Sequence, residues 1–333
     1  MKEHIKWVDC VKVEACILVV LGHFYQSMVV SGILPDHTIY NWVINTIYCF
    51  HVQLFFICSG FLYQRYSNVN NMSTWIKNVK KKVLALGIPY LTFTTVTWML
   101  KHVFSGAVNN ELQTGLVETI FLKPTAPYWY LYALFFIFLI TPNFSNTKMA
   151  VCYLIGAIIG KFFFLSGGGG RYGIYALSVV LQDEVWFVSG MVLCILSANV
   201  SHKAKKGAAI GMIFLVLSVL LLRVEVPDLT ISFLLGVLGC TSVVLLTKAY
   251  QDNLAKSCIF KFMSKYTMPI FLMHTICAAP TRSILFKIGI VSPWIHIPIG
   301  LAVSFGGPIL MAIILKKMKY AEFILYPGKF VKF

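Results

Sequence analysis

The chain carries a succession of apolar runs, most of them long enough to cross the hydrocarbon core of a bilayer. A crossing helix needs about 20 apolar residues, because a helix rises about 1.5 Å per residue. Of the 333 residues, 58% are hydrophobic and 12% are charged, and the mean hydropathy is +0.78. No soluble globular domain needs that much apolar surface, so the sequence predicts an all-α polytopic membrane protein.

About ten transmembrane helices can be drawn, close to residues 9–32, 39–63, 83–104, 127–142, 148–165, 172–199, 207–223, 229–247, 266–287 and 293–316. The fourth and fifth are short. Asp183 and Glu184 interrupt the sixth, so a helix that starts near Val185 behind a re-entrant piece is an alternative there. No soluble segment separates the runs, which predicts one transmembrane domain over residues 1–333 with no appended soluble domain.

Lysine and arginine residues follow the positive-inside pattern. With both termini in the cytoplasm, 21 of the 28 Lys and Arg residues fall on the inner side of a ten-span chain. The formal charge of +16 therefore indicates topology and contact with anionic membrane lipids, and no nucleic-acid partner. The nine cysteines show no CxxC or Cys/His spacing, so no metal site is predicted. The first apolar run lacks a cleavage site and is expected to stay as the first helix of an inner or plasma membrane protein.

Lys12 and His23 are the most informative ionisable residues, because His23 lies in an otherwise uncharged apolar run. An ionisable side chain at membrane depth is costly and usually functional. Eleven residues separate the two, which places them within about 20° on one helix face and about 16 Å apart along the axis. The structural interpretation is that Lys12 snorkels to the surface while His23 bonds a neighbouring helix. The shared face favours a functional site.

Five motifs in order along the chain resemble those of membrane acyltransferase family 3. Asp9-x-x-Lys12 followed by ten residues and His23 is similar to the signature of that family's first helix. Four further segments are similar to later family motifs: Phe50 to Phe61 with Gln53 in place of the usual Pro, Lys80 to Lys82 before Ile88-Pro89-Tyr90, Tyr128 to Leu131, and Tyr266 to His274. The resemblance covers nearly the whole chain.

The resemblance implies an O-acyltransferase of the cell envelope. Such an enzyme moves an acetyl or other short acyl group from cytoplasmic acyl-CoA to a hydroxyl of a cell-surface glycan or its lipid-linked precursor. Acetyl-CoA would be a donor substrate, with no permanently bound cofactor. The acceptor, the acyl length, the need for a partner protein and the formation of a homo-oligomer all stay open at this point.

Site residues follow from the resemblance and from the chemistry of acyl transfer. An imidazole can act as a general base near neutral pH, so His23 is the expected base and His51 the second catalytic candidate. Phosphates of CoA would bind to Lys12, Lys77, Lys80, Lys81 and Lys82. Substrate contacts are expected from Asp9, Trp129, Arg171, Glu184 and His274. Structural interpretations compete: positive-inside topology explains the lysines, an aromatic belt explains Trp129, and a helix N-terminus explains Asp183 and Glu184.

Two other functions are compatible with the same residues. Intramembrane His and Arg also mark transport paths, so a transporter or flippase for a sugar or lipid-linked glycan is the main alternative. Transporters often contain two similar halves, and no internal repeat is evident in this chain. A membrane sensor or scaffold is a third possibility, which the two histidines His23 and His51 disfavour.

Overall fold

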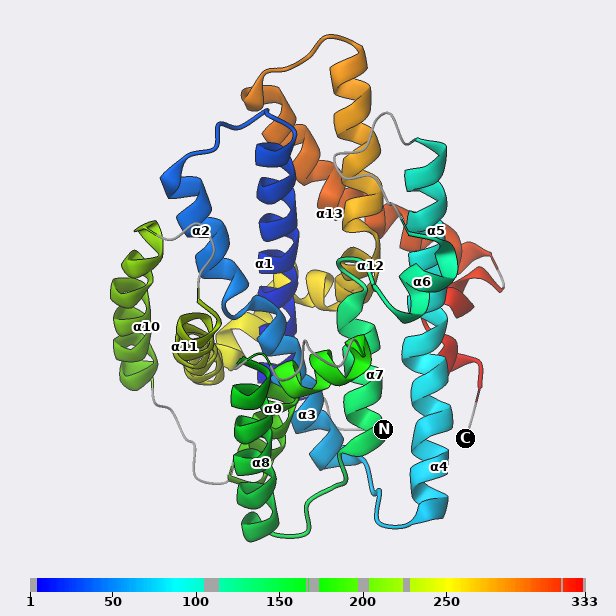
Figure 1. The fold of residues 1–333 in the computed structure, drawn as a ribbon. Helices are drawn as coiled ribbons and strands as arrows, with labels where there is room; N and C mark the ends of the chain where they lie inside the picture. Colours follow the sequence, from blue (N-terminus) through cyan, green and yellow to red (C-terminus); the bar gives the residue numbers. More distant parts are fainter. Residues whose placement is uncertain are drawn as a thin grey trace. The chain divides into compact units, whose positions relative to one another are not determined.

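The computed structural model describes residues 5–104, 114–165, 167, 174–196, 204–223, 228–318 and 320–331, and these residues form helices joined by short connections (Figure 1). The α-helices are α1 Lys6–Val30, α2 Thr38–Tyr48, α3 His51–Tyr66, α4 Met72–Lys82, α5 Ile88–Val103, α6 Leu116–Phe121, α7 Trp129–Ile140, α8 Thr147–Leu165, α9 Tyr175–Leu196, α10 Ala204–Ser218, α11 Leu229–Lys256, α12 Cys258–Lys287 and α13 Pro293–Lys317. Shorter turns are η1 Val83–Gly87, η5 Val219–Arg223, η6 Ala321–Ile324 and η7 Pro327–Lys329.

Within the described residues, eight helical stretches are long and apolar enough to cross a membrane. They are Lys6–Val30, Thr38–Tyr66, Met72–Val103, Tyr175–Leu196, Ala204–Leu222, Leu229–Lys256, Cys258–Lys287 and Pro293–Lys317. The fourth and fifth expected spans correspond to α7, which is only 12 residues long, and to α8. The predicted all-α, multi-pass architecture is confirmed, whereas the cytoplasmic location of both termini stays a prediction.

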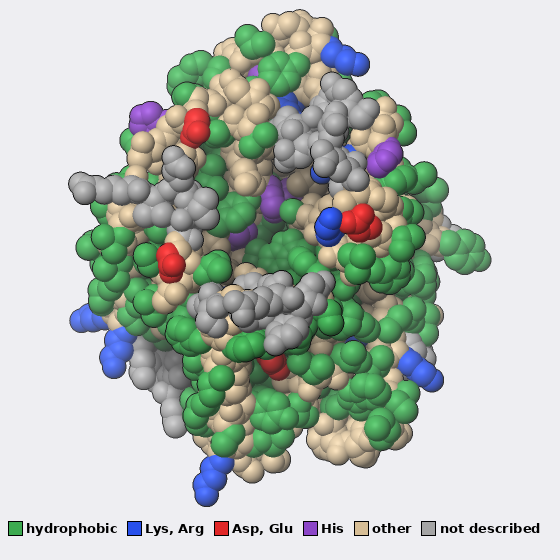
Figure 2. All heavy atoms as spheres, in the orientation of Figure 1, with side chains coloured by type: hydrophobic (Ala, Val, Ile, Leu, Met, Phe, Trp, Pro, Cys, Tyr) green, Lys and Arg blue, Asp and Glu red, His purple; other side chains and the backbone are tan. Residues whose placement is uncertain are grey.

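Apolar side chains also cover outward-facing helix surfaces. On α8 an exposed stripe runs through Val151, Ile155 and Ile159, which are four residues apart and therefore share one face. Hydrophobic side chains make up much of the face drawn in Figure 2, and lysines and arginines are sparse on it. Such surface suits contact with lipid tails.

The chain divides into two compact units, each built from segments far apart in the sequence. The first unit contains Met1–Leu18, His37–Trp75 and Ile140–Lys265. The second contains Val19–Asp36, Ile76–Leu139 and Tyr266–Phe333. The uninterrupted helix α1 contributes its first half to one unit and its second half to the other. The prediction of one domain over residues 1–333 stays a prediction.

The first unit is organised around a close crossing of α3 and α9. A Cβ added to Gly60 would overlap the carbonyl oxygen of Phe187, and one added to Gly190 would overlap that of Ile57. Small residues let helix backbones approach closely, which gives van der Waals contact where lipid removes the hydrophobic drive for helix association. Gly60 therefore permits the close packing of α3 against α9.

Two of the expected spans contain backbone irregularities. The second span is divided between α2 and α3, with Phe50 outside helical geometry. The third contains the π-helical turn η1, which ends just before Pro89. Proline has no N–H, so the regular hydrogen-bond ladder cannot continue through it, and a π-turn relieves the mismatch.

The sixth span differs from the alternative interpretation that begins it near Val185. Helix α9 starts at Tyr175 and continues to Leu196, so Asp183 and Glu184 lie in its interior. Their interpretation as helix N-terminal acids is therefore wrong. In the first unit, Glu184 accepts from the Thr141 hydroxyl at 3.0 Å, and Lys161 donates at 2.8 Å to the carbonyl of Gln182, the residue before Asp183.

Candidate functional site

His23 and His274 form a histidine pair in the second unit. Their ring centroids are 5.4 Å apart and the ring planes are tilted by 36°. His23 is partly exposed, whereas His274 is buried with 2% of its surface accessible. Residues far apart in the chain, on α1 and α12, thus place two titratable rings against each other. The sequence predicted each histidine separately and did not predict the pair.

Backbone carbonyls determine the protonation of the His274 ring. Its Nδ1 lies 3.0 Å from the carbonyl oxygens of both Ile270 and Phe271, so Nδ1 must carry a proton and donate it. In the neutral ring, Nε2 is then an acceptor with a lone pair. Nε2 is buried and has no hydrogen-bond partner among the described residues.

Tyr128 ties the fourth motif to the segment of α12 that carries His274. Its side chain is fully buried, and its hydroxyl donates to the Leu272 carbonyl at 3.0 Å. The Thr97 hydroxyl lies 2.9 Å from the hydroxyl oxygen of Tyr128. Two residues further on, the Tyr130 ring contacts the Phe271 ring, with centroids 5.6 Å apart. The last two family-like motifs therefore meet in the second unit, beside the histidine pair.

A second contact between α1 and α12 lies four residues beyond His23. Arg282, which is buried, donates to the hydroxyl of Ser27. Since His23 meets His274 and Ser27 meets Arg282, the two helices run in the same direction here (Figure 1). On its other side α1 packs on α13, where a Cβ on Gly300 would overlap the Phe24 ring. These contacts hold the His23 segment between two helices.

Lys12 lies in the first half of α1, in the first unit, and is half-buried. The helix is continuous from Lys6 to Val30, so the predicted spacing of Lys12 and His23 on one helix is confirmed. Two residues after Lys12, Glu14 accepts from the Thr247 hydroxyl of α11 at 2.7 Å. Sequence reasoning missed Glu14, although an acid inside an apolar helix obeys the same rule that singled out His23.

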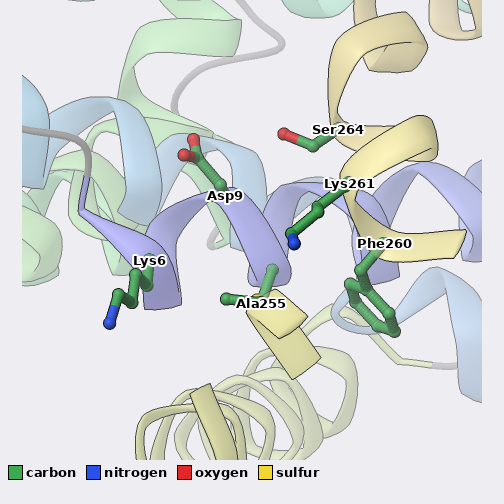
Figure 3. A pocket seen from close by; sticks show the side chains of 7 residues that line it. Lys6, Asp9, Ala255, Phe260, Lys261 and Ser264 are labelled. Carbon is green, nitrogen blue, oxygen red and sulfur yellow. The ribbon is translucent and has the colours of Figure 1, made fainter. Parts of the chain in front are cut away.

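A pocket of about 220 Å³ opens at the start of α1 in the first unit. It is lined by Lys6, Asp9, Cys10, Ala255, Phe260, Lys261 and Ser264. Figure 3 shows Asp9, Lys261 and Ser264 around this pocket. Lys6 pairs with Asp252 at 2.8 Å, so Lys261 is the pocket cation without a salt bridge among the described residues. Asp9, expected to contact substrate, is therefore at a pocket.

His51 is buried in the first unit and has a local structural role. Its Nδ1 lies 2.8 Å from the Ile47 carbonyl, near the end of α2, and therefore donates to it. The side chain thus caps the helix end where the chain breaks between α2 and α3. His23 belongs to the second unit, and a catalytic role for His51 stays a prediction.

The lysine cluster before the π-turn belongs to the second unit. Lys77, Lys80 and Lys81 are exposed. Lys82 is half-buried, and its ammonium lies 3.4 Å from the centroid of the Phe138 ring, a cation–π contact. Three of the four lysines therefore present their charge outward, while the fourth also packs on α7.

The remaining expected substrate contacts are spread over the structure. Trp129 is half-buried at the first residue of α7 in the second unit, and Glu184 lies in α9 of the first. Arg171 lies outside the described residues. Within each unit, the structure brings His274 next to His23 and Asp9 to the pocket at the start of α1. Tyr128, whose hydroxyl was not singled out, emerges as a buried contact of the His274 segment.

A comparison with protein families identifies the family of this chain. The model of an acyltransferase domain, acyltransferase family 3, matches residues 5–313. The chain belongs to the acyltransferase 3 family. The match includes α1 and α12, which carry the histidine pair, and this member is a multi-pass membrane acyltransferase. No curated protein and no solved structure matches the chain.

Proposed function

We propose that this acyltransferase 3 protein transfers an acetyl group from cytoplasmic acetyl-CoA to a hydroxyl of a cell-surface glycan or its lipid-linked precursor. The observation that carries the proposal is His23, a partly exposed imidazole at membrane depth, held against His274 in a chain of this family. A hydroxyl needs a base before it can attack a thioester, and a histidine of ordinary pKa near 6.5 can act as that base.

The chemistry replaces a thioester with an ester. His23 removes the proton from the acceptor hydroxyl as its oxygen attacks the acetyl carbonyl carbon. The tetrahedral intermediate then collapses, the carbon–sulfur bond breaks, and the leaving CoA thiolate takes the proton from the His23 imidazolium.

Basic side chains would bind the donor. Phosphate groups of CoA favour lysine as a point charge, and Lys12, Lys77, Lys80 and Lys81 supply such charges. Lys82, whose ammonium packs on the Phe138 ring, would contribute a further positive charge. The pocket lined by Asp9 and Lys261 is a further opening at the start of α1. About 16 Å of helix axis between Lys12 and His23 suits an extended pantetheine arm reaching from the phosphates to the base.

The acceptor would approach the other end of the same helix. Trp129, Arg171 and Glu184 are the proposed sugar contacts, because an aromatic face, a cation and a carboxylate are the groups that hold sugar rings and their acidic substituents. His51 would assist as a second polar group. The Glu184→Gln variant should use the acceptor less efficiently, while its use of acetyl-CoA should change little.

The test measures transfer of label from radiolabelled acetyl-CoA to the glycan fraction of membranes that contain the protein. We expect His23→Ala to abolish transfer while the protein still elutes as a single folded species in detergent. His102→Ala, which changes an exposed histidine at the end of α5, serves as the matched control and should keep the wild-type rate. Transfer by His23→Ala would remove His23 from the mechanism. A wild-type protein that neither binds nor consumes acetyl-CoA would favour a transporter.

A further inference from the structure

His274 lies against His23, and its buried Nε2 has no hydrogen-bond partner among the residues that the structure describes. Its Nδ1 proton is committed to the Ile270 and Phe271 carbonyls, and its Nε2 has no partner among the described residues. A buried acceptor without a partner is unfavourable, because it has lost its hydrogen bonds to water and gained none in the protein. Such a group persists most readily where it is satisfied during function.

The other two buried histidines differ from His274 on this point. His51 Nδ1 donates to the Ile47 carbonyl and His296 contacts the Ile290 carbonyl at 2.8 Å. The orphan nitrogens found among the described residues include one from histidine, which is Nε2 of His274. Anchoring by a carbonyl is therefore a common structural use of histidine in this chain, and the unsatisfied acceptor distinguishes His274.

The distance between the rings admits a hydrogen bond. With centroids 5.4 Å apart, two ring nitrogens that face each other would be separated by about 3 Å, within hydrogen-bonding range. The carbonyl contacts prevent His274 from exchanging its two nitrogens, so Nε2 stays the acceptor. His23 is the less buried of the two rings.

We propose that His274 is a positioning residue that accepts the N–H of the His23 imidazolium formed during acyl transfer. The inference rests on the proposed function, in which His23 takes the hydroxyl proton. The imidazolium has two N–H groups: one holds the proton destined for the thiolate, and the other donates to His274 Nε2. His274 stays neutral throughout, because its role is to accept a hydrogen bond. The contact orients the base and stabilises its charged form in a buried setting.

Contacts from α7 fix the position of the α12 segment that carries His274. Tyr128 donates to the Leu272 carbonyl, and Tyr130 packs on Phe271, so both flanks of the segment are braced from α7. The ring itself contacts the carbonyl one turn back in its own helix. A positioning residue needs such support, because a loosely held acceptor would not favour one orientation of the base.

Two amide substitutions separate a positioning role from a structural one. His274→Asn can keep a donor near the Ile270 carbonyl but cannot reach the position of Nε2. His274→Gln is longer and can present an acceptor there. We expect the transfer rate at saturating acetyl-CoA to fall about 100-fold in His274→Asn, at the lower end of general-base contributions, and to recover at least tenfold in His274→Gln. The acetyl-CoA concentration for half-maximal rate should change less than threefold in both.

The outcomes are distinguishable. A residue that only packs or caps would make His274→Asn equal to or better than His274→Gln, which would overturn the inference. A His274→Asn rate within twofold of wild type would also overturn it. If His23→Ala keeps transfer activity, the proposed function fails first. If His23→Ala is inactive and both His274 variants are active, only the inference about His274 fails.

Discussion

At the scale of single residues, Lys12 illustrates how a topological residue and a functional one can coincide. It is half-buried at the start of a membrane helix, where positive charge is expected on the cytoplasmic side. It also shares a helix face with His23. The Lys12 end of that face would meet the donor, and the His23 end would meet the reacting carbonyl. If Lys12 serves topology alone, its charge should not affect how tightly the donor binds. If Lys12 binds the donor, the acetyl-CoA concentration for half-maximal transfer should depend on that charge.

Lys12→Gln should therefore raise the acetyl-CoA concentration needed for half-maximal transfer by about 10–100-fold, the loss expected for a charged hydrogen bond of about 1.5–3 kcal/mol. Lys12→Arg keeps the charge and should stay within threefold of wild type. Lys101→Gln, on the side expected to be outer, is the matched control for a helix lysine. Equal effects of the Lys12 and Lys101 changes in donor titrations would exclude a donor role for Lys12.

Residue-scale reasoning recovered part of the site. His23 was predictable because an ionisable group in an apolar run is expensive, and His274 because of its motif. Their contact was not predictable, since it depends on how α12 rotates about its axis against α1. Tyr128 was visible only as part of an aromatic segment, because an aromatic belt and a buried hydroxyl anchor have the same residue types.

At the scale of elements, the helices carry irregularities that spacing alone does not reveal. Residues 39–63 were expected as one span, and the structure divides it between α2 and α3 with a histidine cap at the break. Residues 83–104 were expected to start at the lysine cluster, and helix continues back to Met72 through a π-turn. Hydropathy indicates how long an apolar run is, and both irregularities leave the length of the run unchanged.

The close crossing of α3 and α9 leads to a packing prediction. Gly60→Ala should separate the two backbones and lower stability by about 1–3 kcal/mol or more, because the added methyl overlaps main chain that cannot move alone. Gly156→Ala, in α8 with open space around it, should be neutral. Thermal unfolding of the purified protein in detergent compares the two. Equal midpoints would show that α3 and α9 do not depend on this contact.

Asp228 offers a pH-dependent prediction at the start of α11. Its carboxylate accepts from the Thr230 and Ile231 backbone N–H groups, which lowers its pKa below the ordinary value. A lowered folded-state pKa means that the cap stabilises the helix above the ordinary pKa and loses that effect as pH falls through the folded pKa. The protection of the residue 230 and 231 amides, measured as the ratio of intrinsic to observed hydrogen-exchange rates, should fall over that acidic range in wild type. Asp228→Asn keeps an accepting oxygen and should remove most of the pH dependence.

At the scale of the whole molecule, the orientation in the membrane is the main prediction. Positive-inside counting places the connection between α11 and α12 in the cytoplasm. Cys258 is exposed there, beside Lys256 and Lys261. A membrane-impermeant maleimide should label Cys258 only after the membrane is opened, in a protein whose other exposed cysteine, Cys152, is changed to Ala. Asp36→Cys, between α1 and α2, should be labelled in intact cells.

The reverse labelling pattern would contradict the predicted orientation and would place Lys12 on the side without CoA. Labelling of both positions in intact cells would contradict it as well. Either result would leave membership of the acyltransferase 3 family intact, because that rests on the match over residues 5–313. It would, however, remove the argument that the donor reaches His23 from the Lys12 end of α1.

Composition, hydropathy and motif order were sufficient to predict an all-α, multi-pass acyltransferase and to single out Lys12 and His23. Those features are local, because length of an apolar run and spacing along one helix do not depend on other parts of the chain. The pairing of His23 with His274, the anchored ring and the interior position of Asp183 and Glu184 were decided only in the tertiary structure. Contacts between distant residues depend on helix packing and rotation, and many sequences with the same spacing can differ in both.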